Sequence, residues 1–193
     1  MNEAASVFLR ADIQIQDGNN LADWMNDRQI TQYLNEEEGV SEEILALLDR
    51  APSGMLTYHL NQHGRFFMIC AQAGCSIGFI KLASCAGKSC EIVYAIGEKL
   101  LWGRGYGRRA LDLALGEAFF EMRMERVTAR IMRANLRSIR AAVHCGMRCT
   151  AQKSGLLIYA ITAEEYIAHK LRAQKTPKNA VPHYQPPTRA ASL

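Results

Sequence analysis

The sequence has no long hydrophobic run and little cysteine. No stretch reaches the roughly 18 consecutive apolar residues of a membrane-spanning helix, and the opening Met1-Asn2-Glu3 is unlike the basic, then apolar, start of a secretory signal. Six cysteines are too few for a disulfide-built scaffold in a chain of 193 residues. We therefore expect no membrane partner, a cytoplasmic location and cysteines that are reduced thiols.

A metal site is not expected either. Four cysteines lie at positions 70, 75, 85 and 90 with the symmetry of a zinc site. If residues 75–85 form one strand, its ends lie roughly 30 Å apart at about 3.3 Å per residue, so the two pairs cannot converge on one ion. His59 and His63 fall in a stretch whose polarity is typical of a loop. We predict that the chain binds no metal.

Charge is distributed unevenly, although the net charge is only +4. Residues 1–50 carry 3 basic and 11 acidic side chains, a net charge of −8. Residues 101–150 carry 10 arginines and 4 acidic side chains, a net charge of +6. Arginine suits forked hydrogen bonds to phosphate, so the second block suggests an anionic partner and the first a cationic one. Solvated helix faces are the alternative explanation, and nucleic acid is disfavoured because aromatic residues are not interleaved with the arginines.

The first third of the chain predicts a strand followed by helices. Apolar and polar residues alternate from Val7 to Ile15, which indicates a strand with one buried face. Asp17 is predicted to cap a helix that breaks near Asp27 and then resumes. Ser41, followed by two glutamates, predicts the start of another helix.

The rest of the chain predicts a mixed sheet. Three short apolar segments between residues 66 and 97 favour an antiparallel meander. Helical spacing over 107–122, a strand at 127–131 and a helix from Asn135 to about Cys145 then indicate parallel pairing. Two further strands and a capping box at 162–165 lead into a last short helix. We predict an α/β (α+β) domain over residues 1–172 and a flexible, proline-containing tail over 173–193.

The most informative segment lies between the meander and the long helix. It reads Trp102-Gly103-Arg104-Gly105-Tyr106-Gly107-Arg108-Arg109. The unpaired amides of a helix's first turn bind anions, and glycines let the backbone approach a ligand closely. The segment therefore predicts a phosphate site, with a glycine-rich turn and solvated arginines as the alternative. The spacing fits neither the dinucleotide fingerprint nor the P-loop.

This segment resembles the acetyl-CoA pyrophosphate loop of the Gcn5-related N-acetyltransferase (GNAT) family. A second segment, from Asn135 through Ser138 and Ile139 to Gly146, is similar to the family's Asn-x-x-Ser/Ala-Ile segment, with Met147 in place of phenylalanine. The resemblance covers roughly residues 7–171. It is greatest to the branch with ribosomal-protein N-terminal and polyamine acetyltransferases. It implies a mainly antiparallel, twisted sheet of six to seven strands, flanked by helices and splayed at its centre.

The resemblance also implies which residues bind acetyl-CoA as the co-substrate. The backbone amides of the glycine-rich loop hold the pyrophosphate. The end of the fourth strand pairs with the pantetheine. Asn135 contacts the cofactor or the nearby helix end. One of Arg133, Arg137 and Arg140 reaches the 3′-phosphate. The loop residues are Arg104, Gly105, Tyr106, Gly107, Arg108 and Arg109, and the strand residues are Ala95 and Ile96.

The implied reaction is the attack of a primary amine on the thioester. Glu91 matches the glutamate that many members use as base, and an outward-facing solvated residue is its alternative role. A backbone amide near Ala95 would face the oxyanion. The tyrosine that often serves as general acid is replaced by Ala142. His144, Tyr94, Tyr106 and water stay open as proton donors.

The acceptor is the least determined partner. The acidic N-terminal residues suggest a small cationic metabolite, and a protein N-terminus is the other expected amine. A second copy of the chain, in a homodimer, is a further expected partner. A non-catalytic acyl-CoA-binding or protein-interaction module with the same fold is the alternative function, because the family tyrosine is missing.

Overall fold

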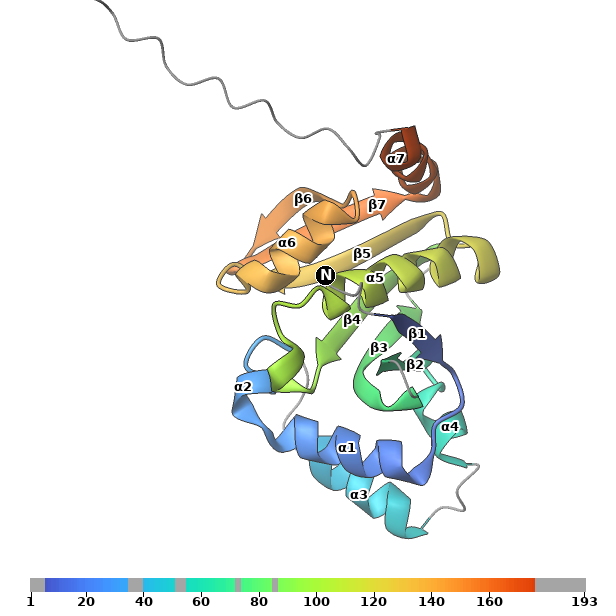
Figure 1. Ribbon diagram of the computed structural model, residues 1–193, viewed down its shortest axis with the longest axis vertical. Helices are drawn as coiled ribbons and strands as arrows, with labels where there is room; N and C mark the ends of the chain where they lie inside the picture. Colours follow the sequence, from blue (N-terminus) through green and yellow to red (C-terminus); the bar gives the residue numbers. More distant parts are fainter. Residues whose placement is uncertain (1–5, 35–39, 51–54, 72–73, 85–86, 176–193) are drawn as a thin grey trace, which may run out of the picture.

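A computed structural model describes residues 6–34, 40–50, 55–71, 74–84 and 87–175. Seven strands form a single sheet in the order β1-β2-β3-β4-β5-β7-β6 (Figure 1). Every neighbouring pair is antiparallel except β4 and β5, which are parallel. The strands are β1 (Val7–Arg10), β2 (Gly64–Ala71), β3 (Ser76–Ser84), β4 (Ser89–Ile96), β5 (Arg126–Met132), β6 (Arg148–Lys153) and β7 (Leu156–Thr162). The predicted meander and the predicted parallel pair are both confirmed.

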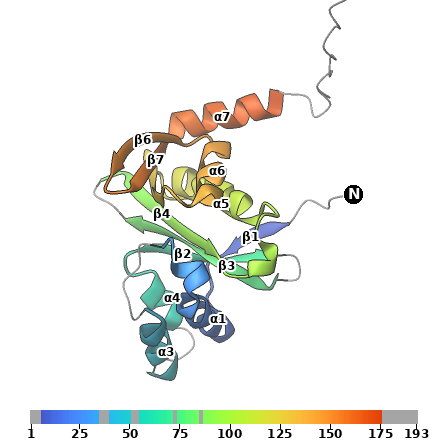
Figure 2. The same ribbon diagram turned by 90° about the vertical axis from the view of Figure 1, so that its left-hand side faces the viewer.

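Helices cover the sheet on both faces (Figure 2). One face carries α5 (Tyr106–Gly116), which continues as a π-helical turn (Glu117–Glu121), and α6 (Leu136–His144). The other face carries α1 (Ile15–Asn26), α3 (Val40–Arg50) and α4 (Met55–Leu60). The short α2 (Arg28–Thr31) follows α1, and α7 (Ala163–Lys175) follows β7.

Strand β2 shows why the sheet needs both layers. Phe67 and Ile69 pack into a core under α5 and α6, whereas Phe66, Met68 and Cys70 pack into a second core under α1, α3 and α4. Each of these side chains is buried. Alternate residues of a strand point to opposite faces, so a continuously apolar strand must be covered twice.

The chain turns earlier than predicted at the start of the domain. The first strand ends at Arg10 rather than at Ile15, because Arg10 donates a 2.9 Å hydrogen bond to the buried carboxylate of Asp17. Gln14, not Asp17, is the N-cap of α1. Asp17 lies three residues into the helix, where its Oδ2 accepts from the Gln14 N–H at 2.7 Å. The buried pair joins β1 to α1.

Two other expectations change in detail. The stretch around His59, predicted as a polar loop, contains α4, whose Leu56 is 2% exposed in the second core. The last helix continues to Lys175, past residue 173, where the tail was predicted to begin. The remainder of that tail lies outside the described residues, and the domain boundary stays a prediction. None of the helices in the described ranges is long and apolar enough to cross a membrane.

The end of β4 is fixed by a close contact that only glycine permits. A Cβ built on Gly97 lies 2.1 Å from the ring of Trp24, so Gly97→Ala must displace the indole. We expect a loss of about 1–3 kcal/mol in the free energy of unfolding, measured by urea titration. Gly116 is the matched control. It has helical dihedrals and its nearest neighbour is the Tyr166 hydroxyl at 3.9 Å, so Gly116→Ala is expected to stabilise by roughly 0.5–1 kcal/mol. Equal effects at both positions would contradict the packing described.

Candidate active site

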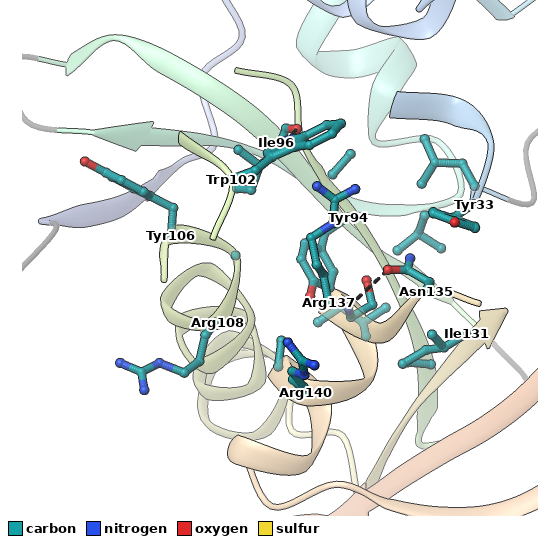
Figure 3. Close-up of a pocket in the computed structure, with 18 of the residues that line it drawn as sticks. Tyr33, Tyr94, Ile96, Trp102, Tyr106, Arg108, Ile131, Asn135, Arg137 and Arg140 are labelled. Carbon is teal, nitrogen blue, oxygen red and sulfur yellow. Dashed lines mark hydrogen bonds between the residues drawn. The ribbon is translucent and has the colours of Figure 1, made fainter. Parts of the chain in front are cut away.

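The site begins where two parallel strands separate. Strands β4 and β5, both described throughout, pair only from Ser89–Arg126 to Glu91–Thr128. Beyond Glu91 they diverge, and a cavity of about 620 Å³ opens between them. Its walls come from α2, β3, β4, β5, α6 and the segment that leads into α5 (Figure 3). Splaying of the central strands, which the family resemblance implied, is therefore present.

The register shows which backbone groups of β4 face the gap. The Gly97 N–H donates to the Ile77 carbonyl at 2.9 Å, and hydrogen-bonded pairs alternate with non-hydrogen-bonded pairs along an antiparallel ladder. The backbone groups of Ala95 therefore face β3, and those of Tyr94 and Ile96 face the gap. The Trp102 indole confirms this for Ile96, because its Nε1–H donates to the Ile96 carbonyl at 2.7 Å.

The glycine-rich segment forms one end of the cavity. Gly103 and Gly105 have φ values of 76° and 87°, a region that favours glycine, and Gly105 is the N-cap of α5. No atom lies within 4 Å of a Cβ built on either residue, so the space beside this backbone is open. Gly107 lies over Tyr94, since a Cβ built on Gly107 would be 3.2 Å from Cε2 of the tyrosine ring. The first turn of α5 thus directs its amides toward the cavity.

The arginines of this segment lie in different surroundings. Arg108 lines the cavity, and its Nη1 lies 2.9 Å from Nε2 of His144. Desolvation, and then the charge of Arg108, lower the pKa of His144, so its neutral ring accepts this hydrogen bond. In Figure 3 the Arg108 side chain points away from Tyr94 and Asn135. Arg104 and Arg109 do not line the cavity, so only Arg108 of the three predicted loop arginines is part of its wall.

Helix α6 supplies two more arginines to the cavity. The Arg137 guanidinium lies 3.8 Å from the centre of the Trp102 ring, a cation–π contact that is visible in Figure 3. Arg140 also lines the cavity, whereas Arg133 donates to Oε1 of Gln152 on β6. Of the three arginines expected to reach the 3′-phosphate, the fold therefore brings Arg137 and Arg140 to the cavity.

Asn135 has a clear structural role at the same place. It is the N-cap of α6, and its Oδ1 accepts from the Ser138 N–H at 3.1 Å. The Ser138 side chain in turn hydrogen-bonds to the hydroxyl of Tyr94, and burial of this phenol raises the pKa of Tyr94 to about 12. Strand β4 and helix α6 are thus joined across the wall of the cavity by side chains that the sequence analysis singled out.

Glu91 lies on the opposite face of β4 from Tyr94. Its side chain is 15% exposed, and its Oε1 accepts a 2.6 Å hydrogen bond from Nε of Arg130 on β5. It lines the cavity, so the structure brings the candidate base and the glycine-rich loop to one space. Sequence reasoning missed Arg130 and Lys81 as residues of this wall. The strand alternation could have found both, but only with the register of β3 and β5 already known.

The position of the missing tyrosine and the remaining candidate proton donors differ in their surroundings. Ala142 is 1% exposed and packs in the core under α5 and α6. Cys145 is buried beside it in that core, and burial raises the pKa of its thiol to about 12. His144 and Tyr106 line the cavity with Tyr94. Across the described ranges, no group of three or more His, Cys, Asp or Glu side chains could hold a metal ion, and Cys85 lies outside those ranges.

The acidic block at the N-terminus contributes little to the described walls. Asp23 is exposed, and Asp27 forms a 2.6 Å ion pair with Lys99. The hydrogen bond from Lys99 lowers the pKa of Asp27. Neither residue lines the cavity. Glu36, Glu37 and Glu38, part of the basis for expecting a cationic acceptor, lie outside the described residues.

A gap between parted strands with a helix N-terminus at one end can take an elongated ligand that carries phosphate. A model of the acetyltransferase (GNAT) domain matches residues 7–148. The chain belongs to the GNAT acetyltransferase family, as the sequence predicted. A search of curated proteins finds no significant match.

Solved structures of acetyltransferases share the fold at low sequence identity. A spermidine N-acetyltransferase from Vibrio cholerae, in complex with CoA and spermine, is 18% identical with a TM-score of 0.68, over 83% of this chain and 98% of that one. RimJ from Mycobacterium smegmatis, in complex with CoA-disulfide, is 17% identical with a TM-score of 0.64, over 90% and 96%. An aminoglycoside acetyltransferase in complex with coenzyme A is 16% identical with a TM-score of 0.68, over 86% and 99%. The predicted fold class is confirmed.

The capping role of Asn135 can be separated from any role in ligand binding. Asn135→Ala removes the acceptor for the Ser138 N–H and is expected to lower the free energy of unfolding by about 0.5–2 kcal/mol, measured by urea titration. Serine is a comparable N-cap residue, so Asn135→Ser should lose much less. If the two variants lose the same stability, the cap does not have this role.

Proposed function

We propose that the chain is an acetyl-CoA-dependent N-acetyltransferase that transfers the acetyl group to a primary amine by direct attack on the thioester. The observation that carries this proposal is the gap between β4 and β5, which has the α5 N-terminus at one end and Glu91 in its wall. The family membership and the coenzyme A complexes of structural neighbours support acetyl-CoA as the co-substrate.

The amides of the first turn of α5 would hold the pyrophosphate, as the resemblance implied for residues 104–109. A helix N-terminus carries roughly half a positive charge, and the open space at Gly105 leaves room for phosphate oxygens. Arg108, Arg137 and Arg140 add positive charge around the same cavity. The pantetheine would lie along β4 beside Tyr94 and Ile96, whose backbone groups face the gap. Ala95 would contribute its side chain to the wall.

Glu91 would prepare the amine for attack. An ammonium group cannot attack a carbonyl carbon, so one proton must first pass to a base, and Glu91 is the carboxylate that the described part of the cavity wall provides. Arg130 positions this carboxylate through its Nε–H. The neutral amine then forms a C–N bond to the thioester carbon, and backbone N–H groups at the end of β4 can stabilise the oxyanion.

The final step breaks the C–S bond and releases a thiolate together with the amide product. The nitrogen, which still carries the positive charge formed by the attack, gives up its second proton, and this proton passes through water or a side chain of the wall to the thiolate. Glu91 then releases the first proton to solvent. The Tyr94 phenol lines the same cavity and is one candidate for this relay, although burial raises the pKa of Tyr94 to about 12 and so makes it a weaker acid than an exposed tyrosine. The acceptor is a primary amine of a small metabolite or of a protein N-terminus.

Glu91→Gln tests the chemical role of the carboxylate. We expect turnover to fall by about 10²–10⁴-fold, because the amide side chain cannot accept the proton, while acetyl-CoA affinity measured by calorimetry stays the same. Glu125→Gln is the matched control, because Glu125 forms an exposed ion pair with Lys88 away from the cavity.

Two outcomes would contradict the proposal. Unchanged turnover in Glu91→Gln would remove Glu91 as the base. A wild-type protein that binds acetyl-CoA but acetylates none of a broad panel of amines and basic peptides would instead be the non-catalytic acyl-CoA-binding module.

A further inference from the structure

Three charged side chains share the sheet face on which an acceptor would meet the gap. The β3–β4 register pairs Lys81 with Val93 and Ala83 with Glu91, so Lys81 and Glu91 project from the same face. The hydrogen bond from Arg130 to Glu91 places Arg130 on this face as well. All three residues line the cavity. This part of the wall therefore combines two cations with one carboxylate.

Lys81 differs from three other lysines in having no ion pair with a described residue. Lys88, Lys99 and Lys170 form ion pairs with Glu125, Asp27 and Asp112. No ion pair or hydrogen bond joins Lys81 to another residue in the described ranges, although its side chain is half-buried in the cavity wall. A half-buried ammonium group that has no counter-ion among the described residues attracts an anion rather than another cation.

The distance between Lys81 and Glu91 limits the size of the acceptor. Lys81 lies diagonally across the ladder from Glu91, two residues farther toward the open end of the gap. Diagonal neighbours are about 7–8 Å apart at the backbone, and a lysine side chain can shorten the distance between the charged ends. An amine held at Glu91 and an anion held at Lys81 can therefore be only a few covalent bonds apart.

We propose that the amine acceptor carries an anionic group, a carboxylate or a phosphate, which binds to Lys81 in the cavity wall. This inference rests on the proposed acetyltransferase function and defines its substrate class. It differs from the cationic metabolite that the acidic N-terminal block suggested, because it is drawn from Lys81, a cation of the described cavity wall. Glu91 then binds the ammonium group, and Lys81 selects for the charge at the other end of the same molecule.

A matched set of amines tests this selection. Propylamine, β-alanine and O-phosphoethanolamine are similar in length and differ in carrying no anion, a carboxylate or a phosphate, and putrescine carries a second cation. Amidated Ala-Glu and Ala-Lys dipeptides present the same N-terminal amine next to side chains of opposite charge. We expect kcat/KM to be about 10- to 100-fold higher for the anionic members, as for a charge-assisted hydrogen bond. The better of the carboxylate and phosphate compounds identifies the anion.

Lys81→Gln should lower kcat/KM for the anionic amines by about 10- to 100-fold and so remove their advantage over propylamine, while KM for acetyl-CoA does not rise. Lys153→Gln is the control, because Lys153 is exposed on β6 and does not line the cavity. Equal or higher activity with propylamine, putrescine or Ala-Lys overturns the anionic acceptor and leaves the acetyltransferase function intact. A rise in KM for acetyl-CoA in Lys81→Gln also overturns it, because Lys81 would then bind the cofactor. No turnover of any amine, by a protein that binds acetyl-CoA, contradicts both proposals.

Discussion

The parting of β4 from β5 is the constraint on which the rest of the site depends. Three residue pairs hold the strands together, and the sheet then offers backbone groups to a ligand instead of to a neighbouring strand. The separation is maintained from both layers. Trp24 packs against Gly97 from the α1 side, and the Trp102 indole hydrogen-bonds to the Ile96 carbonyl. Arg137 then packs on Trp102, so the gap, the glycine-rich segment and α6 form one connected wall.

In the proposed reaction, the two faces of the sheet have different roles. Tyr94 and the first turn of α5 lie on the face covered by α5 and α6, where phosphate groups would bind. Glu91, Lys81 and Arg130 lie on the other face, where an acceptor would approach. A thioester that lies in the gap would be accessible from both faces of the sheet. The uneven charge of the sequence is only partly explained, because members of its arginine block line the cavity while the described acidic residues of the first block do not.

Local signals predicted the parts of the fold that depend on neighbouring residues. Asn135 and Gly146 lie at the two ends of α6, as expected. The glycines before α5 adopt the backbone angles that their loop requires. The prediction of Asp17 as the cap was wrong, because its carboxylate reaches back to Arg10 and to the Gln14 N–H from a position inside the helix. Lys81 and Arg130 could not be assigned to the site, because their meeting with Glu91 depends on strand register. Register is set by long-range pairing that no single segment reveals.

A crystal structure of the protein with acetyl-CoA is the most direct test of the account. It should show the pyrophosphate against the amides that follow Gly105 and the pantetheine between β4 and β5. The thioester carbonyl should lie about 3 Å from a backbone N–H at the end of β4, on the path from Glu91. A cofactor bound outside the gap, or a thioester separated from Glu91 by the closed part of the sheet, would contradict the central claim that the parted strands form the active site.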